Sequence, residues 1–74
     1  MVSNHGGQIM RQYLRDNSGN LLGWRQQMGR RINGYTASGW IVGWFDPVMN
    51  ATHDSHGHRV GTGDLLSGLI VGRL

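Results

Sequence analysis

The sequence predicts an all-β protein: an antiparallel meander of three β-hairpins followed by a short C-terminal helix or strand. The main observation is a segment that occurs three times, at residues 16–24, 36–44 and 54–62, with the pattern Asp/Thr-x-x-Gly-x-x-aliphatic-Gly. Runs typical of β-strands flank each copy. The chain has 74 residues and no cysteine, so we expect a single domain, 1–74, without disulfides.

The first half of each repeat predicts a tight hairpin turn. An aspartate or threonine that opens a type I turn accepts hydrogen bonds from the turn's own backbone. A glycine three residues later adopts the left-handed conformation and forms the bulge that closes the hairpin. The predicted opener and glycine pairs are Asp16 with Gly19, Thr36 with Gly39, and Asp54 with Gly57.

The strands that flank these turns define three hairpins, at about 9–26, 32–45 and 51–62. An Asp46-Pro47 turn closing near Asn50 links the second hairpin to the third. A less distinct turn at 28–31 links the first to the second.

Strand alternation predicts that the tryptophans lie on one face and the second glycines on the other. Trp24 and Trp44 follow the aliphatic residue of their repeats by two positions, and Trp40 joins the same face. We expect this face to be the core or an interface. Gly23, Gly43 and Gly61 would point to the opposite face, which indicates sheet curvature or close backbone packing there.

The C-terminal segment 64–74 is apolar, and we expect it to dock on its own sheet or on that of a neighbouring copy. Asp64 is a possible N-cap for a short helix. Gly68 and Gly72 argue against a helix, so a strand remains an alternative. The predicted core and interface residues are Leu22, Trp24, Trp40, Val42, Trp44, Val60, Leu65, Leu66, Leu69 and Ile70.

The layout resembles that of small uncharacterised β-hairpin-repeat proteins from bacteriophages and bacterial mobile elements. They share Tyr-x-x-Asp-x-x-Gly-x-x-x-Gly, here Tyr13 to Gly23, then an Asp-Pro turn and Thr-x-Asp-x-x-Gly-x-x-x-Gly, here Thr52 to Gly61. A short leucine-rich end follows. The second repeat departs from the pattern, with Thr36 in place of aspartate and Asn33 in place of tyrosine. The resemblance implies a hairpin-repeat fold and supplies no catalytic residue.

The residue types argue against an enzyme. The four acids are all aspartates, and each has a structural role at its position: Asp16, Asp46 and Asp54 in turns and Asp64 at a helix cap. The chain lacks glutamate, lysine and cysteine, and no Ser-His-Asp pattern with a recognisable context occurs. We therefore expect neither catalysis nor a cofactor.

Two alternative sites remain open. His53, His56 and His58 lie within the six residues His-Asp-Ser-His-Gly-His and could bind a transition metal, although a solvated polar turn explains them as well. The net charge of +3 and the arginines near tryptophans could bind nucleic acid. The arginines concerned are Arg11, Arg15, Arg25, Arg30 and Arg31.

A chain this short buries little surface, and it has no cysteine to staple it, so we expect a homo-oligomer. The favoured function is a non-catalytic structural or protein-interaction module of phage or mobile-element origin that self-assembles through apolar sheet faces. A nucleic-acid-binding module and a metal-binding protein are the alternatives. No apolar run is long enough to span a membrane, and we expect a cytoplasmic or virion-associated protein.

Overall fold

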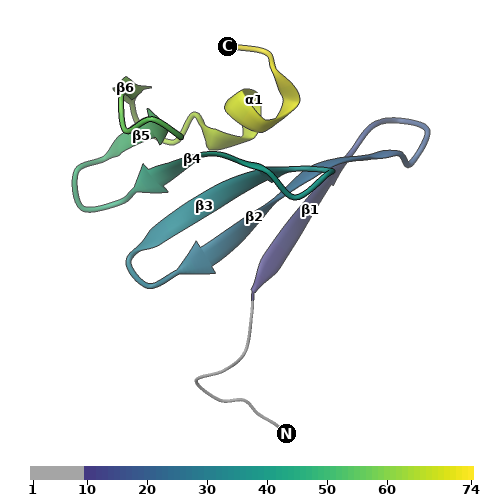
Figure 1. Ribbon diagram of the computed structural model, residues 1–74, viewed down its shortest axis with the longest axis horizontal. Helices are drawn as coiled ribbons and strands as arrows, with labels where there is room; N and C mark the ends of the chain where they lie inside the picture. The colour runs from purple at the N-terminus through teal and green to yellow at the C-terminus, as the bar shows by residue number, and fades with distance from the viewer. Residues whose placement is uncertain (1–9) are drawn as a thin grey trace, which may run out of the picture.

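The computed structural model describes residues 10–74, and these form one six-stranded antiparallel sheet with a short helix on one side (Figure 1). The strands pair in chain order, which confirms the predicted hairpin meander. Residue 9, where the first hairpin was expected to begin, lies outside the described residues. The elements are β1 (Arg11–Arg15), β2 (Leu21–Met28), β3 (Arg31–Thr36), β4 (Ile41–Asp46), β5 (Ala51–Asp54), β6 (Arg59–Thr62) and α1 (Leu66–Val71).

The three repeated turns have the predicted geometry. In the first, the Gly19 N–H donates to the Asp16 carbonyl at 3.0 Å, and the Asp16 carboxylate accepts from the backbone N–H groups of Ser18 and Asn20 at 2.9 Å each. Asp54 opens the third turn with the same three bonds, and Thr36 opens the second with its hydroxyl. Gly19, Gly39 and Gly57 have φ values of 87°, 91° and 84°.

A second β-bulge lies in each returning strand, beyond the predicted bulge at the turn glycine, and the sequence reasoning did not anticipate it. Leu14 pairs with Gly23 and Arg15 with Leu21, so Leu22 has no partner of its own on β1. The same shift occurs at Val42 and at Val60. A bulge interrupts strict alternation. The prediction that Leu22, Val42 and Val60 share a face with the tryptophans by simple alternation is therefore wrong.

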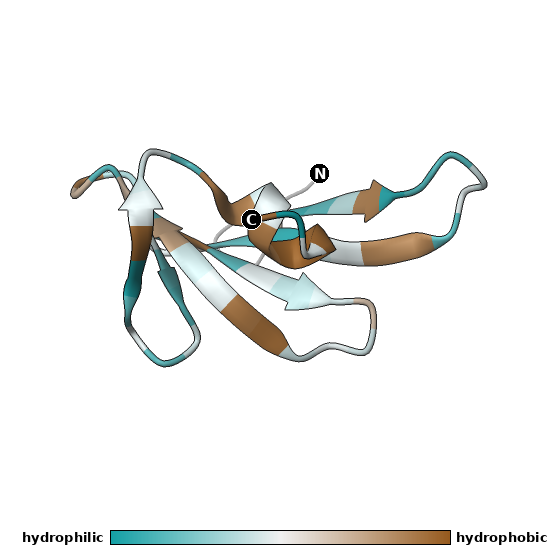
Figure 2. Cartoon of the chain, turned by 90° about the horizontal axis from the view of Figure 1, so that it is seen from above, coloured by the Kyte–Doolittle hydropathy of each residue, from teal (hydrophilic) through white to brown (hydrophobic). Residues whose placement is uncertain are grey.

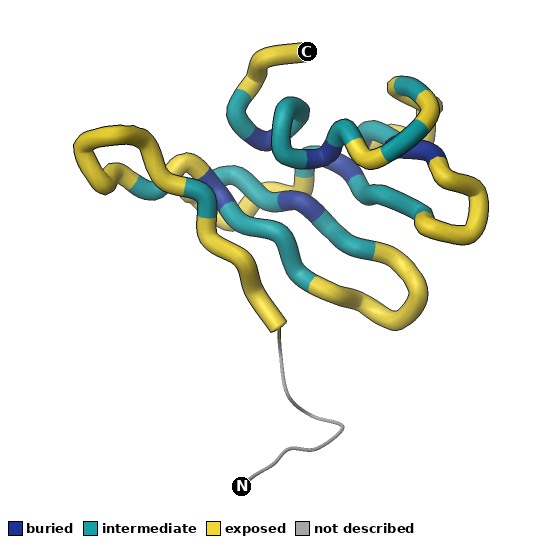
Figure 3. Tube along the Cα trace, turned by 180° about the vertical axis from the view of Figure 1, so that it is seen from behind, coloured by how far each residue is buried: buried dark blue, intermediate teal, exposed yellow. Residues whose placement is uncertain are grey.

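Helix α1 lies on the glycine side of the sheet. A Cβ built on Gly34 would lie 2.7 Å from Leu66 Cδ1, and one on Gly23 would lie 2.5 Å from Ile70 Cγ2. Gly43 and Gly61 face Leu69 and Leu65 in the same way, at 2.8 and 2.7 Å. The glycines therefore let the helix approach the backbone closely, which confirms one of the two predicted reasons for their positions. Figure 3 shows buried positions in α1 and in the strands beneath it.

Polar contacts fix the start of the helix. The hydroxyl of Thr52, which is fully buried, donates to the Gly63 carbonyl at 2.8 Å and accepts from the Leu65 N–H at 2.9 Å. Asp64 pairs with Arg25 of β2 at 2.6 Å. The segment is a helix rather than a strand, but its N-cap is Leu65 and not Asp64. Asp64 instead accepts from the Leu66 N–H and holds Arg25.

The core lies under the helix and not on the tryptophan face. Among residues 10–74, the buried hydrophobic residues are Ala51, Leu66 and Ile70. Trp40, Val60 and Leu22, predicted as core or interface residues, are 75%, 38% and 36% exposed, so they are not part of this core, and their role at an interface stays a prediction. Trp24, Val42, Trp44, Leu65 and Leu69 are half-buried.

Hydrophobic residues run along α1 and form short bands in the strands, while hydrophilic residues predominate in the turns between β1 and β2 and between β5 and β6 (Figure 2). Within the described part of the chain, no helix has the length and apolar character needed to cross a bilayer.

Candidate functional site

The side of the sheet opposite α1 carries aromatic and arginine side chains, and no element of residues 10–74 packs over it. Strand pairing aligns its residues in two rows across the strands. We call this surface the aromatic–arginine face. The first row is Tyr13, Trp24, Tyr35 and Ile41, and the second is Arg11, Gln26, Asn33, Trp44, His53 and Arg59.

Three aromatic rings are neighbours in the first row, one pair stacked and one pair tilted. The Trp24 and Tyr35 rings stack with centroids 5.3 Å apart and planes at 21°, and Tyr13 lies on the other side of Trp24 at 6.2 Å. The rings stand on three neighbouring strands, β1, β2 and β3. Aromatic pairs in such geometry contribute about 0.5–1.5 kcal/mol beyond the burial of their area.

Arginines cover rings on this face. The Arg11 guanidinium lies 5.1 Å from the Trp24 ring centroid, and that of Arg31 lies 4.4 Å from the Trp44 ring. Trp44 also stacks on His53 of β5, with centroids 5.6 Å apart and planes at 20°. Arg15 lies 6.0 Å from Tyr13. These are cation–π distances, and they hold positive charge directly over the apolar rings.

The charge on this face is unbalanced. Neither row contains an acid. Asp46, at the end of β4, lies on the same side as Trp44 and lines a pocket with Arg31. The other aspartates are engaged elsewhere: Asp16 and Asp54 in turns, and Asp64 with Arg25 beside the helix. The N–H of Asn20 keeps the pKa of Asp16 below its ordinary value, and the N–H of His58 does so for Asp54. Four arginines therefore face one aspartate on this side; they are Arg11, Arg15, Arg31 and Arg59.

Unpaired polar atoms also gather on this face. Among residues 10–74, three buried side-chain atoms have no hydrogen-bond partner: Trp24 Nε1, Asn33 Oδ1 and His53 Nδ1. All three belong to the two rows. A buried polar atom without a partner costs free energy, about 1–3 kcal/mol. All three atoms lie beneath the surface of the face rather than on it.

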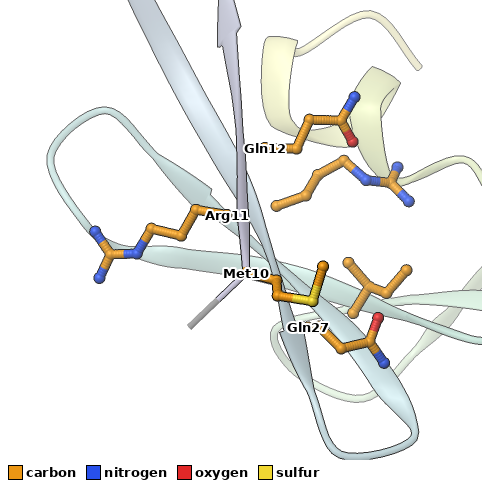
Figure 4. Close-up of a pocket in the computed structure, with 6 residues that line it drawn as sticks. Met10, Arg11, Gln12 and Gln27 are labelled. Atoms are coloured by element: carbon orange, nitrogen blue, oxygen red, sulfur yellow. The ribbon is translucent and has the colours of Figure 1, made fainter. Parts of the chain in front are cut away.

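The five arginines predicted for nucleic-acid binding are not all brought together. Arg11, Arg15 and Arg31 lie on the aromatic–arginine face, whereas Arg25 lies on the helix side and is neutralised by Asp64. Arg30 is exposed in the turn between β2 and β3. Figure 4 shows the division at β1, where the Arg11 side chain points away from those of Met10, Gln12 and Gln27.

That figure draws a pocket beside the helix rather than the face itself. Met10, Gln12, Arg25, Gln27 and Ile32 line it along with Arg11. The pocket holds no acid–base pair.

The three histidines predicted as metal ligands do not converge. The His53 ring is turned onto Trp44, while the His56 and His58 rings lie at the turn with centroids 6.2 Å apart. His53 pairs across the hairpin with Arg59, because of the bulge at Val60, and not with His58. Over residues 10–74, no group of three or more histidine, cysteine or acidic side chains has metal-site geometry.

The residues that sequence reasoning missed are the partners of the tryptophans: Tyr13, Tyr35, Asn33, and His53 as a stacking residue. A signal for them exists in the alternate positions Arg11-x-Tyr13 and Asn33-x-Tyr35, which place polar and aromatic residues on one face of a strand. Cross-strand register then determines which rings meet, and the bulges set that register.

The arrangement offers stacking, cation–π contacts and positive charge for noncovalent binding, and it presents no nucleophile with an adjacent base. The resemblance to phage and mobile-element proteins stays a prediction. Comparison with protein-family models, with curated proteins and with solved structures finds no match for this chain.

Proposed function

We propose that this protein is a non-catalytic interaction module and that its aromatic–arginine face binds a macromolecular partner. The observation that carries the proposal is that arginine side chains lie on top of aromatic rings, on a sheet face that α1 does not cover. Arg11 and Arg31 lie over Trp24 and Trp44, and no acid is present in either row. Exposed apolar surface combined with unpaired charge is typical of binding surfaces.

The composition of the face favours an anionic partner. Arginine binds phosphate and carboxylate groups with two parallel hydrogen bonds, and it does so while stacked on an aromatic ring. A neutral apolar partner would bury these guanidinium groups without compensation, which is costly. The partner should therefore bring negative charge to Arg11, Arg15 and Arg31.

The proposal is tested by NMR with the indole N–H signals of Trp24 and Trp44 as reporters. The probes are a single-stranded oligonucleotide, a duplex, polyglutamate and increasing concentrations of the protein itself. We expect at least one of them to shift both indole signals and leave the amide signals of Ser67 and Leu69 in α1 in place. If none shifts the indoles, the face is not a binding surface.

Variants sharpen this test. The double variant Arg11→Gln/Arg31→Gln removes two charges from the face, and Arg30→Gln/Arg73→Gln removes two charges elsewhere. Only the first should abolish the indole shifts. Equal losses in both variants would mean that net charge, and not this face, is responsible.

We also propose self-association as a second function, on a separate observation. The buried hydrophobic residues of 10–74 number three, while Met28, Val48 and Met49 are exposed around one pocket at the end of the sheet. Arg30, Arg31 and Asp46 also line this pocket. A second copy could cover the three apolar side chains. Sedimentation equilibrium should then show a dimer or larger species that Met49→Gln weakens, and a monomer at all concentrations would contradict it.

A further inference from the structure

The aromatic–arginine face suits one class of anionic partner better than others. We propose that it binds single-stranded nucleic acid, with phosphates on Arg11, Arg15 and Arg31 and bases against the aromatic rows. This inference rests on the proposed function, because it names the partner of the same face. Single strands are bound elsewhere by basic surfaces with interleaved aromatic rings.

The positions of the arginines match a strand that crosses the sheet. Arg11 and Arg31 lie on β1 and β3, which are two strand spacings apart, about 10 Å. Their guanidinium groups lie over rings of β2 and β4. Cations and rings therefore alternate across the strands, which is the order in which a single strand presents its phosphates and bases.

The most exposed ring of the first row lies at its edge. Tyr13 stands on the edge strand β1 and is 49% exposed. Its exposed side can accept a base, whereas the rings of Trp24 and Trp44 already have an arginine or another ring on them. Trp40 is 75% exposed, but it pairs with Thr36 and directly precedes Ile41 of the first row, which places it on the helix side of the sheet.

The rings favour bases over other polyanions. Every base has a flat face that stacks on an aromatic ring, whereas the carboxylates of an acidic polymer have none. A duplex fits poorly, because a groove admits one helix or a two-stranded ribbon and not the face of a six-stranded sheet.

The test is fluorescence anisotropy of the full chain with four labelled probes. These are a single-stranded thymidine 12-mer, its duplex, an abasic strand of equal length, and polyglutamate. We expect the single strand to bind at least tenfold more tightly than each of the others. Raising the salt concentration from 50 to 200 mM should weaken binding of the single strand about 20-fold. Three phosphate contacts give a slope near −2 for the logarithm of the affinity against the logarithm of the salt concentration.

Variants assign the contacts. Arg11→Gln/Arg31→Gln should weaken binding at least tenfold and reduce the salt slope by about 1.4, because each lost contact removes about 0.7. The matched control Arg30→Gln/Arg73→Gln should change the affinity for the single strand less than threefold. Tyr13→Ala should weaken binding of the thymidine strand about fivefold or more and leave the abasic strand unaffected. Circular dichroism of each variant confirms that it is folded.

Two results would overturn the inference. Equal binding of the abasic strand or of the duplex would show that charge alone is responsible. If the single strand does not bind but polyglutamate or self-association still shifts the Trp24 and Trp44 indole signals, the inference fails while the proposed binding face stands. If no probe shifts them, both fail together.

Discussion

The two faces of the six-stranded sheet differ in the size of their side chains and in whether a helix covers them. The helix-covered face presents glycines, Gly23, Gly34, Gly43 and Gly61, and the packing there is of leucine and isoleucine side chains against bare backbone. The aromatic–arginine face presents the longest side chains of the chain and is covered by no element of residues 10–74. The packing that stabilises the fold thus lies on the side with the smallest side chains, and the face that we propose for binding carries large ones.

The largest difference between the faces should appear on truncation of one aliphatic residue from each. Leu66→Ala removes a fully buried side chain under the helix and should reduce the free energy of unfolding by about 3 kcal/mol. Ile41→Ala removes a side chain from the first row that is 42% exposed and should cost less than about 1 kcal/mol. Urea denaturation measures the free energy of unfolding of both variants. Equal losses would contradict the difference in packing between the two faces.

Substitution of a glycine on the helix side should destabilise the protein nearly as much as Leu66→Ala. The Cβ of Gly43→Ala would lie 2.1 Å from the His53 carbonyl oxygen and 2.8 Å from Leu69 Cδ2, so strand and helix must both shift, at a cost of about 2 kcal/mol. Gly57→Ala is the control, because nothing lies within 4 Å of its Cβ and only its positive φ opposes the change. A smaller loss at Gly43 than at Gly57 would contradict close packing.

These glycines show how far sequence reasoning reaches. The turns and the strand order follow from local chemistry, since an Asp-x-x-Gly turn is specified by four adjacent residues. Sequence reasoning left the C-terminal segment open between a helix and a strand. Local chemistry does not determine which face of the sheet forms the core. Large apolar residues lie on both faces, and the core forms on the face where α1 docks. Gly34 is outside the repeat, yet it contacts both Leu66 and Ile70.

The candidate site was predictable only in part, for a related reason. Arg11, Arg15 and Arg31 were selected from composition, but Arg25 was selected with them although its side chain points to the helix and Asp64. The pairs of Trp44 with His53 and of Trp24 with Tyr35 come from cross-strand register. The bulges at Leu22, Val42 and Val60 set this register, and no single residue of the sequence marks them.

Substitution in the repeated turn, which lies on neither face, should cause an intermediate loss of stability. Gly39→Val places a β-branched residue at φ 91° and should destabilise the protein by about 1–2 kcal/mol. Ala37→Val, two residues earlier in the same turn, is the control and should be nearly neutral. An unchanged denaturation midpoint for Gly39→Val would mean that the glycine is not needed for the turn.

The smallest effect should come from the ion pair that ties the helix to the sheet. The Arg25 side chain lowers the pKa of Asp64, so the stability that this carboxylate contributes is present above the ordinary aspartate pKa, about 3.9, and is lost as the pH falls through the lowered value. Arg25→Gln should cost less than about 1 kcal/mol at pH 7, because Asp64 is partly exposed.

Comparison at two pH values isolates this pair, since Asp16 and Asp54 titrate alike in both proteins. The gap in stability between the wild type and Arg25→Gln should narrow at pH 2.5. A gap that stays constant from pH 7 to pH 2.5 would show that the pair contributes no charge-dependent stability.

The account depends most on the side of the sheet to which α1 docks, and nuclear Overhauser contacts in the full chain measure that side directly. We expect cross-peaks from the Gly34 α-protons to the methyl groups of Leu66 and Ile70, and none from the indole protons of Trp24 and Trp44 to those methyls. Cross-peaks between these indoles and the helix methyls, without the Gly34 contacts, would place the helix on the tryptophans and contradict the account.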